Sequence, residues 1–465
     1  MNRKLKPVLL RFLVIITICF FSWPGNAQSS LIKSNELHVG IGIIDITGDS
    51  AVVLDPLNVK AVVIQQGEEL IALVECDVIS IDREWTIPAR QIASANTGIP
   101  FSNICVAATH NHMYSPHKDL REAVIEAITK AKANLRPVVL KSAIGQQFNV
   151  SFNRRYFMKD GSVVFNPMFL NPEIVRPVGP IDPEVGMVLF YDRLTLKPVS
   201  SLINFSLHLD VVKEYGAVYQ KSGTGSRNSV SADFPYWIET AFRKDFGNNF
   251  HSVFLTGCCG NINHWDFSKP GPQSGWQTKS KQVGDSLYQS IKRSLPKAVE
   301  EVPSLAARSK VIDIPLQSFS KEDLAWAIGI NENALSRKSE DASERQQFLN
   351  NVKRRRVLWL EAQKQKGIVS LPIDVQVFRL SNETAIVTLP GEMFVEFGLT
   401  IKNFSPFRNT IVVEMSNNNV AYVPNKKAFV QGGYEVENSR LVPGGGELLV
   451  EAALLMLKEL KVARE

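Results

Sequence analysis

Two histidines separated by a single residue have the clearest chemical potential in this chain. His110 and His112 follow the run Ser102–Ala108, whose small and β-branched side chains predict a buried strand. Residues two apart in an extended chain point the same way, so we expect both imidazoles on one face at the end of this strand. Two neighbouring imidazoles can chelate zinc or a similar transition metal.

The scarcity of histidine strengthens this interpretation. The chain has seven histidines, and three of them, His110, His112 and His117, fall within a stretch of eight residues. A His-x-His pair on its own is often just two polar residues in a loop. The clustering favours a metal site over that alternative.

The first residues predict a secretory signal peptide over residues 1–27. Four basic residues precede or flank the apolar run Val8–Phe21, and Gly25–Ala27 offers the small residues that a signal peptidase needs. The apolar run is short for a membrane span. Ile18 is bulky where a lipoprotein signal before Cys19 would need a small residue. We therefore expect an exported protein, periplasmic or extracellular.

The positive charge of the chain lies largely in this segment. The full sequence has 52 Lys and Arg against 46 Asp and Glu, and removal of residues 1–27 leaves 48 against 46. A nearly balanced mature chain gives no electrostatic reason to expect a nucleic-acid partner.

Four cysteines remain beyond the signal segment, namely Cys76, Cys105, Cys258 and Cys259. They are too few to hold a chain of this length together, so the core must be hydrophobic. We interpret Cys258 and Cys259 as small residues packed near a site. A disulfide with another cysteine stays possible in an oxidising compartment.

Strand and helix patterns alternate through the whole chain, which predicts a large α/β or α+β domain. A charged stretch within about 318–368 has helical spacing, which favours a solvated two-helix excursion over a basic ligand patch. Strands are expected at Ala61–Gln65, Ile71–Cys76, Ile104–Ala108, Gly186–Tyr191, Ser201–Leu207, Ser252–Leu255, Asp374–Leu380, Thr384–Leu389 and Thr410–Glu414, and helices at Asp119–Ala133, Pro235–Phe246, Gln282–Ala298 and Gly446–Leu460.

Two segments beside predicted strands carry further candidates. His208 follows the expected strand Ser201–Leu207, where a histidine is either structural or a metal ligand. Arg154 and Arg155 follow an expected strand at Asn149–Phe152. Paired arginines are usually solvated, whereas an arginine in a site binds a carbonyl oxygen or a carboxylate.

Three loops complete the set of candidate segments. The glycines of Thr256–His264 either form a tight turn or let the backbone approach a ligand closely. Glu392 is expected to open a helix over Met393–Ile401, where it favours the helix N-terminus or acts as a carboxylate ligand. The loop Asn417–Pro424 is rich in asparagine and contains Tyr422.

Together and in this order, the segments resemble the neutral/alkaline ceramidase family. The resemblance spans roughly residues 38–445, and each motif is weak alone. The matches are Thr109–His112 for the family's Thr-His-x-His motif, with Pro116 beyond it, Asn204–His208 for a strand ending in a zinc histidine, Asn153–Arg155 for the substrate loop, Pro390–Glu392 for the Pro-Gly-Glu ligand motif, and Asn419–Tyr422 with Tyr434–Glu435 for the tyrosine loop.

The resemblance implies residues 28–465 as one large α/β domain with a central mixed sheet flanked by helices. It also implies one zinc ion above the strand ends. The implied ligands are one or both of His110 and His112, together with His208, Glu392 and Tyr422. A ligand set of histidine and glutamate with one open position is typical of catalytic rather than structural zinc.

The chain also departs from the family. Asn263 stands where the family has its proposed serine nucleophile, and His264 stands in place of a proline. The Ser-Gly-Pro that follows the two histidines is altered to Met113–Pro116. We expect no C-terminal immunoglobulin-like domain after the helix Gly446–Leu460.

The resemblance therefore implies hydrolysis of an amide (N-acyl) bond by zinc-activated water, with a ceramide-like lipid as the leading substrate. Arg154 would steady the carbonyl oxygen and Tyr422 the oxyanion. His112 would be the acid or base if it is not a ligand, and Asn263 would position the substrate.

Two other functions stay open. One is a zinc esterase or deacetylase acting on an acylated glycan or another small substrate, and the other is a binding protein without turnover on the same fold. For the lipid substrate, peripheral contact with membrane lipid is possible. The oligomeric state is left open.

Overall fold

The large sheet of the protein is assembled from strands that lie far apart in the sequence. The computed structural model describes residues 36–48, 52–113, 119–212, 229–271, 276–330 and 344–462. The expected signal peptide, Pro116 and His117 lie outside these residues. The nine-stranded sheet has the order β14-β12-β11-β6-β1-β3-β4-β5, with β16 paired to β6 beside this path.

This sheet is mixed, because β4 pairs with β5 and β12 with β14 in parallel, whereas its other pairs are antiparallel. The strands are β1 (Leu37–Asp45), β3 (Asn58–Gln66), β4 (Glu69–Cys76), β5 (Ile104–Ala108), β6 (Arg136–Gln146), β11 (Glu184–Asp192), β12 (Pro198–Phe205), β14 (His251–Thr256) and β16 (Val299–Glu301).

A second sheet of four strands packs on one face of the large sheet. Val62 and Leu73 of the large sheet share a buried cluster with Phe378 and Ile386 of the second. Period-two alternation sends the neighbouring Val377 to the opposite face, towards helices. The strands, in sheet order, are β17 (Pro303–Pro315), β18 (Ser370–Ser381), β19 (Thr384–Thr388) and β21 (Asn409–Val413).

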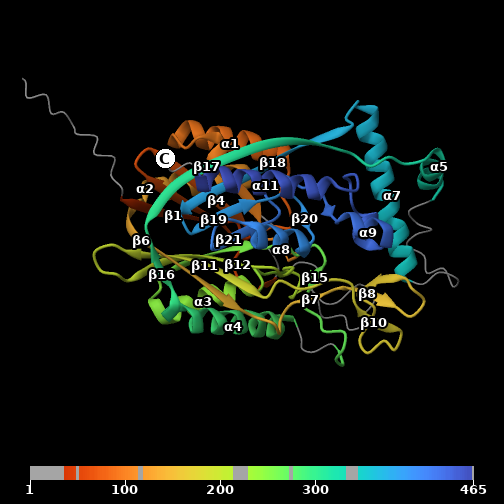
Figure 1. The fold of residues 1–465 in the computed structure, drawn as a ribbon, viewed down its shortest axis with the longest axis horizontal. Helices are drawn as coiled ribbons and strands as arrows, with labels where there is room; N and C mark the ends of the chain where they lie inside the picture. Colours follow the sequence, from red (N-terminus) through yellow and green to blue (C-terminus); the bar gives the residue numbers. More distant parts are fainter. Residues whose placement is uncertain are drawn as a thin grey trace, which may run out of the picture. The chain divides into compact units, whose positions relative to one another are not determined.

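Helices cover the outer faces of both sheets and complete a helix–sheet–sheet–helix arrangement (Figure 1). The helix α2 lies against β1, where a Cβ at Gly40 would stand 1.9 Å from the Ala131 carbonyl oxygen. Glycine is therefore required for this close packing. The helices are α1 (Arg83–Thr97) and α2 (Leu120–Ala133) on one half of the large sheet, α3 (Phe234–Phe246) and α4 (Trp276–Ser294) on the other half, and α8 (Val395–Phe404) and α11 (Gly445–Val462) on the second sheet.

Short elements at the strand ends connect these layers. Two small pairs matter for the site, β7 (Phe152–Asn153) with β15 (Ile262–Asn263), and β20 (Glu392–Met393) with β22 (Tyr422–Val423). The remaining elements are β2 (Val52–Val53), β8 (Arg155–Met158), β9 (Val163–Phe165), β10 (Ile174–Pro177), β13 (Ser229–Val230), α5 (Lys321–Gly329), α7 (Glu344–Gln365), α9 (Lys426–Gln431), α10 (Tyr434–Glu437), and the 3-10 helices η1 (Phe101–Asn103) and η3 (Leu295–Lys297).

The mixed α/β architecture with a central mixed sheet is confirmed. The charged stretch contains α5 and α7, which pack on each other (Figure 1). Within the described residues, no helix is long and apolar enough to cross a membrane.

Four local predictions are wrong. β12 ends at Phe205, two residues earlier than expected, and the strand expected at Asn149–Phe152 is reduced to β7. The helix expected at Gln282–Ala298 is shifted, because α4 begins at Trp276 and ends at Ser294. Glu392 does not open a helix, because it pairs within β20 and α8 begins only at Val395.

Candidate metal centre

His110 and His112 meet through a turn rather than through an extended strand. β5 ends at Ala108, and His110 has a φ of 64°, in the left-handed region. The expectation that both imidazoles project from one face of a strand is therefore wrong in its geometry. Their Nε2 atoms nevertheless lie 3.4 Å apart. The turn therefore brings together the two imidazoles that we expected strand periodicity to align.

A backbone carbonyl orients the ring of His110. The Nδ1 atom lies 2.8 Å from the Ile79 carbonyl oxygen, so in the neutral ring Nδ1 donates the proton and Nε2 carries the lone pair. Such a bond to the second ring nitrogen is the usual support of a metal-ligating histidine. The lone pair of His110 thus faces His112.

Glu392 joins two of the histidines. Its Oε2 atom lies 3.2 Å from His110 Nε2 and 3.2 Å from His208 Nε2. The preceding Gly391 has a φ of 60°, and a Cβ there would stand 2.4 Å from the Ala421 carbonyl oxygen. Only glycine fits this turn without strain, and the turn delivers the carboxylate to the centre.

These groups have the composition and the spacing of a metal site. The ligating atoms of His110, His112 and His208 all lie within 4.8 Å of one another. Zinc–nitrogen bonds of about 2.0–2.1 Å place tetrahedral donors roughly 3.3 Å apart, close to the 3.2–3.4 Å separations found here. The group could hold a metal ion.

The charges of the centre depend strongly on one another. Burial lowers the pKa of His110, but the charge and hydrogen bond of Glu392 outweigh it and raise the pKa to about 9. Burial and the neighbouring Arg154 lower the pKa of His208. Burial would raise the pKa of Glu392, yet His110 and His208 hold it well below its ordinary value. Glu392 is therefore ionised and available as a ligand.

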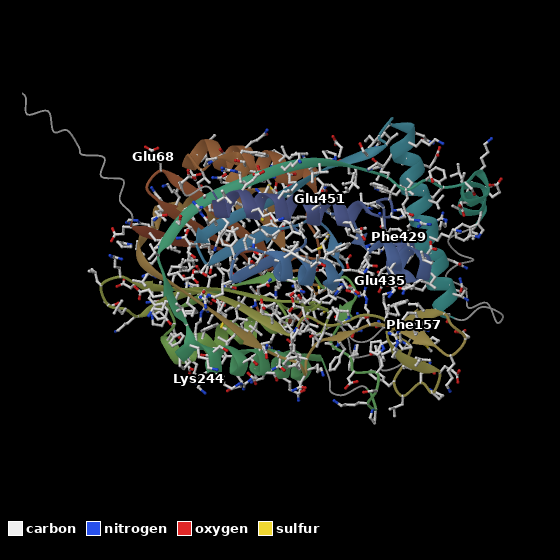
Figure 2. All side chains as sticks on the ribbon, in the orientation of Figure 1. Glu68, Phe157, Lys244, Phe429, Glu435 and Glu451 are labelled. Carbon is white, nitrogen blue, oxygen red and sulfur yellow. The ribbon has the colours of Figure 1, made fainter. Side chains whose placement is uncertain are left out.

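Arg154 lies against this centre and is buried. Its Nη1 atom is 3.3 Å from His208 Nε2, and its Nε donates to Glu435 Oε1 at 2.8 Å. Glu435, labelled in Figure 2, is fully buried in α10 and also faces Arg155 Nε at 3.5 Å. The carboxylate therefore anchors two buried arginines, of which only Arg154 reaches the histidines in the described structure.

Tyr422 is placed beside Glu392 by the parallel pair β20 and β22, in which these two residues are register partners. The guanidinium of Arg154 lies 5.2 Å from the centre of the tyrosine ring. Burial raises the pKa of the Tyr422 hydroxyl well above its usual value, with Arg154 opposing and Glu392 adding to the increase. The phenol thus keeps its proton when no metal is bound.

The amide of Asn263 is engaged by its neighbours. Its Nδ2 donates to Asn166 Oδ1 at 2.7 Å, and its Oδ1 accepts from the Trp265 backbone amide at 2.9 Å. Among the described residues, these bonds connect it to Asn166, which follows β9, and to its own loop, and not to the histidines. The next residue, His264, is buried, with Nδ1 3.2 Å from Asp210 Oδ1.

Asp210 and the contact of His264 were not among the sequence candidates, and Glu435 was named only as part of the tyrosine-loop match. Asp210 stands two residues after His208, the same spacing as in His110 and His112, so the spacing could have drawn attention to it. Burial would raise the pKa of Asp210, but its hydrogen bond to His264 and the charges of His264, His208 and His112 hold it well below its usual value.

The glycine-rich turn after β14 packs closely against protein. A Cβ at Gly260 would stand 2.5 Å from the Glu392 carbonyl oxygen, so the glycine admits the β20 backbone. Cys259 donates to the buried Glu414, with Sγ 2.9 Å from Oε1. Cys258 and Cys259 are buried and free, as are Cys76 and Cys105, so no disulfide joins these four.

Comparisons with known proteins bear on the fold. No protein-family model matches the chain, and no curated protein matches its sequence. Among solved structures, it is similar to the neutral ceramidase from Pseudomonas aeruginosa, with a TM-score of 0.65, 17% identity, and coverage of 92% of this chain and 75% of that one. A ceramidase complexed with C2 gives the same score and identity, with 76% of that chain covered. The fold is therefore ceramidase-like.

Proposed function

We propose that this protein is a zinc-dependent hydrolase that cleaves an amide (N-acyl) bond, with a ceramide-like lipid as its leading substrate. The observation that carries the proposal is a group of three histidines, His110, His112 and His208, that could hold a metal ion. Glu392 lies 3.2 Å from two of them, and the buried Arg154 lies beside them. The similarity of the fold to that of ceramidases supports amide chemistry.

Zinc fits this donor set. Neutral imidazoles and one carboxylate are ligands that zinc prefers, whereas magnesium and calcium favour sites made of oxygen alone. His110, His208 and Glu392 would hold the ion, with His112 or Tyr422 as a further ligand. When bound, zinc would polarise a substrate carbonyl and make water a stronger acid.

Arg154 would bind the carbonyl oxygen of the scissile amide. Its guanidinium is permanently charged and is held by Glu435 on one side. On the other side, its Nη2 is buried without a hydrogen-bond partner among the described residues. A buried, pre-oriented donor of this kind stabilises negative charge that develops on oxygen during acyl transfer. The protonated hydroxyl of Tyr422 would supply a second donor.

Water is the nucleophile in this proposal. Asn263 has no hydroxyl or thiol. The nitrogen and the oxygen of its side-chain amide both form hydrogen bonds that hold its loop in place. It therefore positions the substrate through this loop. His112 is either a ligand or the group that moves a proton between water and the leaving nitrogen.

A cavity favours a lipid as substrate. A space of about 660 Å³ lies against β8 and β10 and is bordered by Asn153, which directly precedes Arg154. Its walls include Phe152, Tyr156, Leu170, Ile174, Val175 and Phe267. Leu170 and Val175 are more than half exposed, which suits an acyl chain that enters from a membrane surface.

The signal peptide expected over residues 1–27 supports a protein exported to the periplasm or the medium, where it would meet such lipids. An acylated glycan is the second substrate class, hydrolysed by the same centre acting as an esterase or deacetylase. Binding without turnover is the remaining alternative.

A substrate panel tests the proposal. Purified protein is assayed with N-acylsphingosines of short and long chains and with O- and N-acylated sugars, before and after chelation and with zinc restored. We expect cleavage of the N-acylsphingosine, loss of activity on chelation and recovery with zinc. Cleavage of acyl sugars alone would select the esterase or deacetylase. Tight calorimetric binding of the lipid without any product would select the binding protein.

A further inference from the structure

A second histidine–carboxylate pair borders the candidate metal centre. His264 is about 1% exposed, and its Nδ1 atom lies 3.2 Å from Asp210 Oδ1. Its other ring nitrogen, Nε2, is buried and has no hydrogen-bond partner among the described residues. An imidazole with one nitrogen on a carboxylate and the other nitrogen free is the arrangement that enzymes use to move protons.

Both members of the pair come from segments that build the centre. Asp210 stands two residues after His208, and the His112 backbone amide donates to the carbonyl oxygen of the neighbouring Leu209 at 3.0 Å. His264 follows β15, which pairs with β7, and the Arg154 amide at the end of β7 donates to the Asn261 carbonyl oxygen at 2.9 Å. The pair thus shares its supporting backbone with Arg154 and its loop with His208.

A purely structural ion pair does not account for this geometry. Burial of a polar nitrogen without a partner is unfavourable, so a purely structural role leaves the unbonded Nε2 of His264 unexplained. The side chain of Asp210 is 29% exposed, so the pair reaches the edge of the buried centre. Both features fit a nitrogen that awaits a substrate or a water molecule.

We propose that His264 transfers the proton in amide hydrolysis and that Asp210 is its positioning residue. The inference rests on the proposed hydrolase function. As the water oxygen bonds to the carbonyl carbon, His264 Nε2 accepts one proton from that water. As the carbon–nitrogen bond breaks, the same proton passes to the leaving nitrogen, which departs as an amine. The acyl group becomes a carboxylic acid, whose remaining proton is lost to solvent to give the carboxylate. Asp210 orients the ring and stabilises its charged form.

This assignment gives His112 a defined role. His112 Nε2 lies 3.4 Å from His110 Nε2, within the spacing of the ligand set. With His264 as the proton carrier, His112 is free to act as a ligand. Asn263 then serves to hold the loop that presents His264.

The test compares His264→Gln and Asp210→Asn with His251→Gln, a histidine that also faces a carboxylate, Glu239, but lies outside the centre. We expect kcat to fall about 10²–10⁴-fold for His264→Gln and at least about 10-fold for Asp210→Asn. In both variants, KM should change less than about threefold and zinc content should match wild type. His251→Gln should keep wild-type kcat.

Rescue separates proton transfer from packing. Added imidazole should restore part of the kcat of His264→Ala, because the small base can occupy the vacated space, and should leave wild type unchanged. Wild-type kcat in His264→Gln, or zinc loss equal to that of His208→Ala, would overturn the inference while leaving the hydrolase function intact. A wild-type protein that cleaves no amide or ester in the panel would overturn both proposals.

Discussion

Two buried glutamates, Glu392 and Glu239, each lie close to nitrogen atoms of several basic side chains. The two clusters, each consisting of a glutamate and these side chains, differ in chemistry. Glu239 lies on α3, where Lys60 Nζ contacts Oε2, Arg243 Nη2 lies 2.7 Å from Oε1 and His251 Nδ1 lies 3.3 Å from Oε1. Two of these three partners carry a permanent charge at neutral pH. The carboxylate is therefore neutralised by its own side-chain neighbours.

At Glu392 the partners are imidazoles. His110 and His208 each lie 3.2 Å from its Oε2, and no lysine or arginine forms an ion pair with it among the described residues. The charge of Glu392 is balanced either by a proton, for which His110 has a pKa raised to about 9, or by a metal cation. A buried carboxylate in such surroundings needs one of the two.

The comparison shows that donor geometry alone does not distinguish a salt bridge from a metal site. Both clusters place nitrogens about 3 Å from a glutamate oxygen. What differs is whether the nitrogens can give up their protons, as imidazole does and guanidinium does not. Among the described partners, Glu392 faces the imidazoles of His110 and His208, which can both offer lone pairs to a metal. At Glu239 a single imidazole, His251, stands beside two cations.

The largest expected difference between the two clusters is in zinc content and turnover after one side chain of each cluster is replaced. In His208→Ala and Glu392→Ala, we expect the zinc content to fall from about one equivalent per chain to near zero. Turnover should fall more than about 10³-fold, because the Lewis acid is lost. His251→Ala, the matched change beside Glu239, should keep both. Metal content by mass spectrometry and initial rates are the measurements. Full zinc occupancy in both His208→Ala and Glu392→Ala would refute the metal assignment.

Arg154 sharpens the comparison, because it is a permanent cation that touches the Glu392 cluster through His208. We expect Arg154→Ala to lower kcat about 10²–10³-fold, the usual loss for one donor to a developing oxyanion. Zinc content should stay at the wild-type level. Arg154→Lys should recover little, because an ammonium group cannot hold Glu435 and present a second donor together. Loss of zinc in Arg154→Ala would instead place the arginine in metal binding.

Substitutions of Asn263 test whether water is the nucleophile at the Glu392 cluster, with no nucleophilic side chain. We expect Asn263→Ala to lower turnover about 10- to 100-fold, through loosened positioning of the substrate. Asn263→Ser should give no gain over wild type. Rapid quenching and intact-mass analysis should find no acyl group on the protein. A trapped acyl-enzyme, or an inactive wild type activated by Asn263→Ser, would show that a side-chain nucleophile is required.

The sequence predicted the main sheets because their strands carry long apolar runs. Ile71–Cys76 and Thr384–Leu389 were recognisable without any partner and match β4 and β19 closely. The short pairs β7 with β15 and β20 with β22 were not recognisable. They have two residues per strand and form only because distant chain segments are brought together.

The residues of the candidate site could be predicted from the sequence, but their arrangement in space could not. His110, His112, His208 and Glu392 were named from motif order, and the structure brings them together. No sequence period indicates the positive φ of His110 or the strand pairing of Glu392. The Asp210–His264 contact spans 54 residues and depends on two loops that no local pattern describes.

The smallest expected effect concerns the Glu239 cluster, whose contribution to the free energy of unfolding should decrease at acidic pH. Burial would raise the pKa of Glu239, but Lys60, His251 and Arg243 lower it from 4.5 to about 2. The associated stability is fully present above pH 4.5 and is lost as the pH falls towards 2, at most about 3 kcal/mol. We expect Glu239→Gln to be less stable than wild type above pH 4.5, and the gap to narrow below it. Denaturant unfolding between pH 2 and 7 measures this, with zinc content unchanged at neutral pH. A gap that does not vary with pH would show that the charge of Glu239 adds nothing to the fold.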